Sequence, residues 1–425
     1  MSRRRFLRGL AGIALSGLVP CIVRASRGAH VVIIGGGFAG GACATWLKRL
    51  DPQLRVTLIE RNRSFPTGFF CNTAVAGLRP FTSIRSGPAG LAARGVSVRI
   101  ASVVDIDPVA RRIRLADGTV LSADALVVAP GIDMRLEAIP GFGPEEAARN
   151  PPAWPGSESA LAMVRARLRA LPEGGTIAVV APPAPYRCPP GPYERVSLFA
   201  HHLRRCNPRA KILILDAKDA FSKQALFQEA WGQLYAGMIE WHGRQDGATA
   251  REIDQGAGTV LTASGERVHA DWVHVIPAQR AGRLAQHAGL CAPSGWIDVH
   301  ASDLSIDGLE HVYALGDAVQ LQPMPKSAFA AYNQAVQCAR AIVASFAGAA
   351  HAPSAMANTC YSLVGRHYAF SVSSRYEVSA QEGLAVANAA TQLSPLAAGQ
   401  DVRQREAREA EQLYRHLRRE CFNAE

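Results

Sequence analysis

The most reactive side chains in this sequence are nine cysteines, and their spacing limits the chemistry open to them. None forms a CxxC pair or a CxxCH haem-attachment site, so neither structural zinc nor covalently bound haem is expected within the chain. Any disulfide must therefore join cysteines that are far apart in the sequence. Apart from Cys21 near the N-terminus, they are Cys43, Cys71, Cys188, Cys206, Cys291, Cys338, Cys360 and Cys421.

A glycine-rich turn follows the apolar run at 29–34 (AHVVII), which predicts a buried strand. Its GxGxxG positions are Gly35, Gly37 and Gly40. The first glycine permits a tight turn and the second lets the backbone approach a pyrophosphate. The third lets a helix over 42–50 pack closely on the strand.

A second strand, predicted over 55–59, delivers Glu60 twenty residues after Gly40. A carboxylate at this distance can accept hydrogen bonds from an adenosine ribose. The order of strand, glycine turn, helix and acid therefore predicts a dinucleotide site, with a glycine turn that holds no ligand as the alternative.

Two later motifs indicate which dinucleotide is bound. The segment 125–131 (ALVVAPG), ending in Gly131, resembles the strand and turn that close the FAD domain of two-dinucleotide flavoprotein reductases. The segment 313–318 (YALGDA) resembles their late motif, whose aspartate, here Asp317, contacts the ribityl and pyrophosphate region of the flavin. The alternative for Asp317 is a helix N-cap, and the two roles are compatible. Since the motifs are far apart, the FAD domain is expected to be discontinuous, with another domain inserted.

The inserted domain has a strand pattern at 176–180 (TIAVV), but the turn at 181–191 is rich in proline. Proline has no N–H to offer a phosphate and blocks the glycine geometry, so this turn disfavours a nicotinamide dinucleotide. The run at 211–215 (KILIL) predicts the next parallel strand, which ends at Asp216.

Three sequence blocks in order resemble the flavoprotein subunit of flavocytochrome c sulfide dehydrogenase, within the superfamily of FAD-dependent pyridine nucleotide-disulfide reductases. They are 188–195 (CPPGPYER), 323–331 (PMPKSAFAA) and 358–364 (NTCYSLV). The resemblance extends over about 29–377. It implies an enzyme that oxidises sulfide to sulfur or polysulfide through a redox disulfide and FAD.

By this resemblance, Cys188 and Cys360 form the redox disulfide beside the flavin. Hydrosulfide would attack one sulfur, leaving a persulfide on it and a thiolate on the other, which passes two electrons to the flavin. The sequence does not say which sulfur is attacked. Two unrelated buried cysteines, or an ordinary stabilising disulfide, are the alternatives.

The resemblance also implies that Cys71 bonds covalently to the flavin 8α-methyl carbon. Asn72 follows it, where proline or a bulkier residue is expected in the family. A buried free thiol is the alternative for Cys71.

Two charged residues have candidate roles. Glu194 could accept or deliver protons during sulfide chemistry if burial raises its pKa, or it could pair with Arg195 or another cation. Lys326 precedes a helix expected over 327–346, and its charge could stabilise a reduced flavin; an exposed loop lysine is the alternative. The remaining candidates are expected to be structural, and none is expected to bind a metal: His201, His202, Cys206, Cys291 and Cys338.

The electron acceptor is expected to be a separately encoded c-type cytochrome subunit. Sulfide:quinone oxidoreductases are the nearest alternative, but they need an apolar membrane surface. Here 401–420 is densely charged, and polar residues interrupt 329–346, so stable membrane insertion is not expected. A non-catalytic flavin-bearing sulfur-carrier or interaction protein is a second alternative, and a pyridine-nucleotide disulfide reductase is a more distant third.

The charge pattern indicates an export signal rather than a nucleic-acid site. The net charge is +11, but 1–25 contain five arginines and no acid, and the remaining basic residues form no block. The segment from Ser2 to Arg8 (SRRRFLR) resembles the twin-arginine export motif, which predicts a folded cargo in the bacterial periplasm. A basic tail on a cytosolic protein is the alternative.

The fold class predicted from these features is α/β. It has two Rossmann-like domains of the glutathione-reductase type, the first discontinuous, and a C-terminal interface segment. The expected boundaries are 1–25 for the signal, 29–151 with 277–347 for the FAD domain, 152–276 for a degenerate NAD-type domain carrying one redox cysteine, and 348–425 for a C-terminal domain carrying the other.

Overall fold

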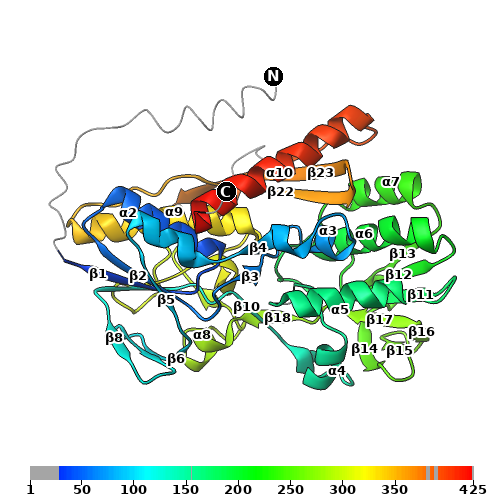
Figure 1. Cartoon of the computed structure of the whole chain (residues 1–425), viewed down its shortest axis with the longest axis horizontal. Helices are drawn as coiled ribbons and strands as arrows, with labels where there is room; N and C mark the ends of the chain where they lie inside the picture. The colour runs from blue at the N-terminus through cyan, green and yellow to red at the C-terminus, as the bar shows by residue number, and fades with distance from the viewer. Residues whose placement is uncertain (1–27, 155, 380–382, 387–390, 424–425) are drawn as a thin grey trace.

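The computed structural model of the chain describes residues 28–154, 156–379, 383–386 and 391–423. They form two halves, each centred on a parallel sheet, with a C-terminal hairpin and helix lying across both (Figure 1). The predicted twin-arginine segment and Cys21 lie outside the described residues.

The first sheet has five parallel strands in the order β20, β9, β1, β2 and β5. Its central strands are almost continuous apolar runs because helices and loops cover both faces of the sheet. The strands are β1 (His30–Ile34), β2 (Arg55–Glu60), β5 (Ser97–Ile100), β9 (Ala125–Val128) and β20 (Val312–Ala314).

Two helices, α2 (Phe38–Leu50) and α9 (Ala328–Phe346), pack against each other on this sheet. The helix predicted after the glycine turn begins four residues earlier than the expected start at position 42. The helix expected over 327–346 is confirmed, with the Ser327 hydroxyl accepting a hydrogen bond from the Ala330 N–H as its N-cap.

The second sheet is parallel, with the strand order β13, β12, β11, β17. The prediction that the run at 211–215 forms the parallel strand next to the run at 176–180 is confirmed, since β12 pairs with β11. Its strands are β11 (Thr176–Ala181), β12 (Lys211–Asp216), β13 (Ile239–His242) and β17 (Trp272–Val275). The helices of this half are α5 (Glu158–Arg169), α6 (Gly191–Cys206) and α7 (Gln224–Leu234).

The chain crosses between the halves at two adjacent strands. The outgoing strand β10 (Ile132–Met134) pairs antiparallel with the returning strand β18 (Gln279–Ala281). The whole second sheet lies between them in the sequence, whereas β20 of the first sheet follows the return. The first half is thus built from two separate stretches of chain.

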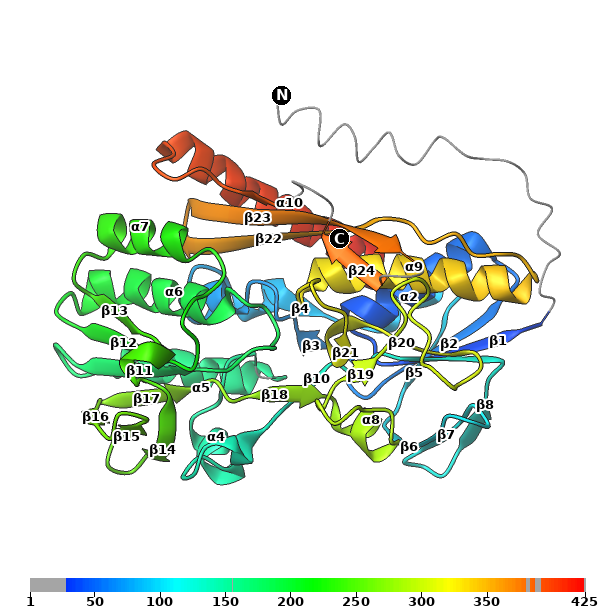
Figure 2. The same cartoon turned by 180° about the vertical axis from the view of Figure 1, so that it is seen from behind.

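The C-terminal hairpin, β22 (Met356–Gly365) and β23 (Tyr368–Ser379), bridges the two halves. Strand β22 contacts α6 of the second half and α9 of the first, as the view from behind shows (Figure 2). The charged helix α10 (Gln400–Phe422) packs on β23 and α2, with Ala410, Tyr414 and Leu417 buried. The hairpin can therefore carry a residue from the C-terminal segment to the boundary between the halves.

The remaining helices and strands are short and mostly connect the parts already described. They are β3 (Phe65–Pro66), α3 (Cys71–Val75), β4 (Arg85–Ser86), β6 (Val103–Asp107), β7 (Arg112–Leu115), β8 (Val120–Ser122), α4 (Pro144–Arg149), β14 (Ala250–Asp254), β15 (Thr259–Thr262), β16 (Arg267–His269), α8 (Arg283–His287), β19 (Ile297–Asp298), β21 (Val319–Gln320), β24 (Gly383–Val386) and β25 (Gln392–Leu393).

Candidate active site

The turn between β1 and α2 has the shape that a dinucleotide requires. Gly35 has a φ of 101°, and a Cβ there would collide with the Ala129 carbonyl. A Cβ on Gly40 would collide with the Gly35 carbonyl, whereas Gly37 has open space on the side where its Cβ would lie. Helix α2 also begins without a side-chain cap or an acid in its first turn, so its free N–H groups are available to an anion.

Glu60 closes the same site from the end of β2. Its carboxylate accepts hydrogen bonds from the Gly36 N–H (2.8 Å) and the Asn62 N–H (2.9 Å). These two bonds fix the carboxylate beside the glycine turn and leave further lone pairs for a ribose hydroxyl.

Asp317 offers a buried acceptor atom. Its Oδ2 accepts a hydrogen bond from Arg187 Nε (2.6 Å), while its Oδ1 is buried without a hydrogen-bond partner among the described residues. A ligand hydroxyl would satisfy that atom. Arg187 also approaches Gly131, where a Cβ would lie 3.2 Å from the guanidinium. These residues and the glycine turn together fit an FAD.

Two alternatives for the residues of this half are wrong. Asp317 lies inside a 3-10 turn (Gly316–Ala318) whose N-cap is Leu315, so Asp317 is not a helix N-cap. Lys326 is buried rather than exposed: its Nζ donates to the Val319 carbonyl (2.5 Å) and lies 3.7 Å from the centre of the Trp296 ring. Burial lowers the pKa of Lys326 to about 8, although Asp317 opposes this.

The thiols of Cys188 and Cys360 meet where the two halves and the hairpin converge. They are hydrogen-bonded to each other, and both residues are partly exposed. Cys188 comes from the proline-rich turn, has a φ of 57° and donates its N–H to the Lys326 carbonyl (2.8 Å). Cys360 comes from β22. The structure therefore brings together the two cysteines that sequence resemblance pairs.

The two thiols differ in acidity. The hydrogen bond between them, with Cys188 as donor, raises the pKa of Cys188 well above its ordinary value, and burial adds to this. The same hydrogen bond lowers the pKa of Cys360 to about 7, against the effect of burial and with help from the charge of Lys223. A negative charge on this pair is therefore most stable on Cys360.

Glu194 ties three segments of the site together. Its Oε1 accepts the Leu363 N–H of β22 (3.0 Å), and its Oε2 accepts from Asn72 Nδ2 (2.9 Å). The carboxylate therefore bonds to these two groups rather than forming the alternative ion pair with Arg195. Burial raises the pKa of Glu194, although these hydrogen bonds oppose the shift, so the carboxylate is a stronger proton acceptor than an exposed glutamate.

Cys71 is the first residue of α3 and is buried, directly after Phe70, which has a φ of 63°. Burial raises its pKa to about 11, and the charge of the nearby Arg195 guanidinium opposes the shift. Asn72, the unexpected residue beside it, is the donor to Glu194. The Cys71 segment and the cysteine pair therefore share one hydrogen-bond network.

The end of β12 is where a second dinucleotide site would place its ribose acceptor. Here Asp216 accepts hydrogen bonds from the Tyr193 hydroxyl (2.6 Å) and Trp241 Nε1 (3.0 Å) and forms an ion pair with Lys218. The ring of Tyr193 stacks on Phe221 at 3.7 Å. Side chains of the chain itself therefore already bond to the carboxylate that would accept a ribose hydroxyl.

Three residues of the site were missed from the sequence. Arg187 stands directly before Cys188, and that adjacency could have identified it. Asn72 was noted only as a departure from the family. Lys223 lies in a polar stretch that predicts an ordinary loop, and no local pattern identifies it.

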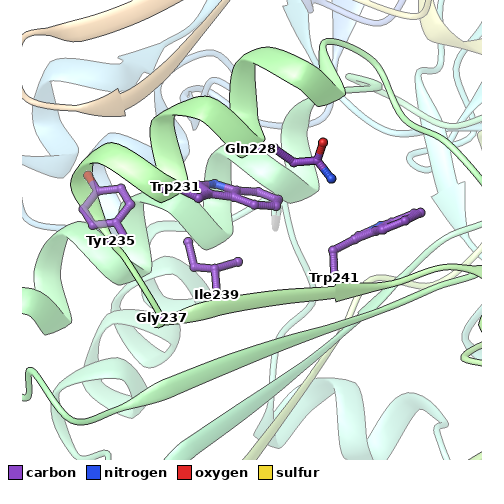
Figure 3. A pocket seen from close by; sticks show the side chains of 7 residues that line it. Gln228, Trp231, Tyr235, Gly237, Ile239 and Trp241 are labelled. Carbon is purple, nitrogen blue, oxygen red and sulfur yellow. The ribbon is translucent and has the colours of Figure 1, made fainter.

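A separate pocket of about 250 Å³ opens between α7 and β13 (Figure 3). Trp231, Tyr235 and Trp241 line it, and none of the predicted site residues does. The indole N–H groups already bond to Ser197 and Asp216, so the pocket offers no free polar group from these rings.

The described residues contain no cluster of three or more His, Cys, Asp or Glu side chains that could hold a metal ion. Within the same ranges, no helix has the length and apolar character needed to cross a membrane.

A flavin-type glycine turn on one parallel sheet, a second sheet of dinucleotide-binding type and a cysteine pair between them define a flavoprotein of the disulfide oxidoreductase class. Residues 29–161 match the pyridine nucleotide-disulphide oxidoreductases. Residues 161–277 match the central part of the flavoprotein chain of sulfide dehydrogenase (flavocytochrome c), and 352–422 match the flavin-binding part of flavocytochrome c sulphide dehydrogenase.

A sulfide dehydrogenase (flavocytochrome c) flavoprotein chain from Chlorobaculum thiosulfatiphilum is 48% identical over 43 residues, which make up 10% of this chain and 90% of that sequence. The chain belongs to the family of flavocytochrome c sulfide dehydrogenase flavoprotein chains. This confirms the resemblance, but its expected end near 377 is wrong because the family match continues to 422.

Solved structures confirm the fold class. The sulfide:quinone oxidoreductase of Aquifex aeolicus has a TM-score of 0.73 at 18% identity, covering 92% of each chain. A NAD-dependent persulfide reductase from A. fulgidus has a TM-score of 0.58 at 17% identity, covering 91% of this chain and 78% of its own. At these identities the likeness concerns the fold alone.

Proposed function

We propose that this protein oxidises sulfide to sulfur or polysulfide through a Cys188–Cys360 disulfide and FAD, and passes the electrons to a c-type cytochrome subunit. The observation that carries the proposal is the contact between these two thiols at the boundary between the halves. Family membership supports the same substrate and partner.

Bound FAD would supply a two-electron acceptor that can release its electrons one at a time. The glycine turn at Gly35 and the acid Glu60 would hold its adenosine end. Asp317 would bond its ribityl and pyrophosphate region. Lys326 and the N-terminus of α9 would stabilise negative charge on the isoalloxazine ring.

The disulfide gives sulfide oxidation a defined first step. Hydrosulfide attacks one sulfur, the S–S bond breaks, a persulfide forms on the attacked cysteine and the other leaves as a thiolate. Glu194 can take the proton that H₂S or the persulfide gives up, since its carboxylate lies in the same network and its pKa is raised by burial.

The aromatic residues around Asp216 support an enzyme that does not use a nicotinamide cofactor.

The electron acceptor is tested by mixing the FAD-loaded protein with sulfide under anaerobic conditions and measuring the reduction of a c-type cytochrome and of a soluble quinone. We expect faster cytochrome reduction. Preferential quinone reduction together with vesicle binding would instead assign the protein to the quinone branch. A flavin that sulfide does not bleach would favour the non-catalytic alternative.

We also propose that Cys71 holds the flavin covalently. Cys71→Ser should abolish covalent attachment, because a hydroxyl lacks the nucleophilicity of a thiolate. The measurement is flavin fluorescence on a denaturing gel, with the mass of the intact chain as a second readout. Cys206→Ser, at an exposed cysteine on α6, is the matched control. Covalent flavin that persists in Cys71→Ser would refute the assignment.

The periplasm is the proposed destination, on the basis of the twin-arginine motif at Arg3-Arg4. A covalent flavin suits that compartment, where a dissociated cofactor is hard to replace. Fractionation of cells that express the chain and its Arg3→Lys/Arg4→Lys variant tests this: the variant should stay in the cytoplasm.

A further inference from the structure

Lys223 is a buried cation at the edge of the cysteine pair. It immediately precedes α7, has a φ of 63° and is only 6% exposed. Its Nζ donates a hydrogen bond to the Cys360 carbonyl (2.8 Å) and lies 5.6 Å from the centre of the Phe370 ring. A non-glycine residue in the left-handed region costs free energy, and such residues gather where a site requires them.

The same backbone feature recurs around the site. Phe70, Trp154 and Cys188 also have positive φ values, of 63°, 57° and 57°. Phe70 precedes Cys71, and the ring of Trp154 lies against Gly191, where a Cβ would also be 3.1 Å from Cys188 Sγ. Lys223 is therefore one of several residues near the cysteines whose backbone is held in the left-handed region.

Within the described residues, the Nζ of Lys223 bonds to a backbone carbonyl and lies near an aromatic ring, and no carboxylate forms an ion pair with it. The titratable groups that face it are Cys360 on β22, Glu194 on α6, Cys188 in the proline-rich turn and Glu406 on α10. Glu406 accepts hydrogen bonds from Ser371 and Ser394. Burial lowers the pKa of Lys223, and the negative charges of these groups oppose that effect, Cys360 foremost.

A buried ammonium group is costly unless a nearby anion compensates it. A closed disulfide carries no charge, so it adds no counter-ion to the carboxylates of Glu194 and Glu406, whereas an opened disulfide adds a thiolate. The cation therefore favours the open state in which the negative charge lies nearest to it. Its hydrogen bond to the backbone of Cys360 places it on that side of the pair.

We propose that Lys223 is the positioning residue that makes Cys360 the leaving thiolate, so that hydrosulfide attaches to Cys188. The inference rests on the proposed function of the pair. In this step a bond forms between hydrosulfide and Cys188 Sγ, the Cys188–Cys360 bond breaks, and its electron pair stays on Cys360 Sγ. The products are a Cys188 persulfide and a Cys360 thiolate, with atoms and charge balanced.

The first test measures thiolate formation without turnover. The full-length, FAD-loaded protein is reduced and alkylated with iodoacetamide across a pH series under anaerobic conditions, and each cysteine peptide is quantified by mass spectrometry. In the wild type, the pH profile of Cys360 alkylation should have an apparent pKa of about 7, and Cys360 should become reactive at a lower pH than Cys188. Lys223→Met should raise this pKa by at least one unit, which lowers the thiolate fraction of Cys360, and with it the alkylation rate at pH 7, about fivefold or more.

Lys223→Arg should restore the wild-type pH profile because it retains the charge, and Lys223→Gln should not, although it can still donate a hydrogen bond. A purely structural role for Lys223 would change the melting temperature but not the midpoint of alkylation. An unchanged Cys360 midpoint in folded Lys223→Met would overturn the proposal.

The second test locates the persulfide. Wild-type protein with a closed disulfide receives one equivalent of sulfide, is blocked at once and is digested. The additional sulfur should be on the Cys188 peptide; its presence on Cys360 would overturn the proposal. If Cys188→Ser retained full sulfide turnover, the function proposed for the pair would be refuted. The alkylation profile would still show whether Lys223 stabilises the Cys360 thiolate, because that test does not depend on turnover.

Discussion

Replacing either Cys188 or Cys360 by serine should lower sulfide-dependent cytochrome reduction by about 10³-fold or more. The two sulfurs act as a unit, and the loss of one member removes most of the effect of both. A serine at either position cannot form the disulfide that hydrosulfide opens. The measurement is the anaerobic rate of cytochrome reduction, with flavin content determined for each variant.

The matched control for these variants is Cys206→Ser, because Cys206 is an exposed cysteine away from the pair. It should retain both flavin and rate. The double variant Cys188→Ser/Cys360→Ser should be no slower than either single variant. A single variant that loaded FAD and kept more than about a tenth of the wild-type rate would contradict a redox role for the pair.

Replacing Glu194 by glutamine should lower the rate of sulfide oxidation by about 10²- to 10⁴-fold, the range for loss of a general base. The substitution keeps the shape of the side chain and an acceptor for the Leu363 N–H. Only the deprotonated carboxylate can accept a proton, and burial raises its pKa. The wild-type rate should therefore fall as the pH drops through that raised value.

The Glu194→Gln variant should lose this acidic limb of the pH–rate profile, and that loss distinguishes proton transfer from a structural effect. Glu173→Gln, at an exposed ion pair with Arg209, is the control and should leave the profile unchanged. A Glu194→Gln enzyme that was slow but kept the same acidic limb would show that another group takes the proton.

The dinucleotide half of the fold could be predicted because its signals are local. The strand, glycine turn and acid around Gly35 and Glu60 occupy one continuous stretch of chain. The start of α2 was misplaced because glycines at its N-terminus have low helix propensity, and tertiary packing overrides it. At Gly41, a Cβ would collide with the Cys421 carbonyl of α10, so the helix needs glycine there.

The residues of the candidate site could be predicted only where they lie within a recognisable sequence motif. The proximity of Cys188 and Cys360 followed from the family resemblance, since no local pattern joins residues so far apart. Lys223 and Asn72 could not be found in this way, because their roles depend on burial against β22 and α6. The exposed alternative for Lys326 failed for the same reason: its burial depends on Trp296, which is distant in the sequence.

The most direct test of the central claim is an anaerobic sulfide titration of the oxidised, FAD-loaded protein, followed by flavin absorbance and a count of free thiols. The account predicts that sulfide bleaches the flavin in the wild type and in Cys206→Ser, but not in Cys188→Ser or Cys360→Ser. Flavin that is bleached equally fast in all four proteins would show that sulfide reaches the flavin without the disulfide, and would contradict the account.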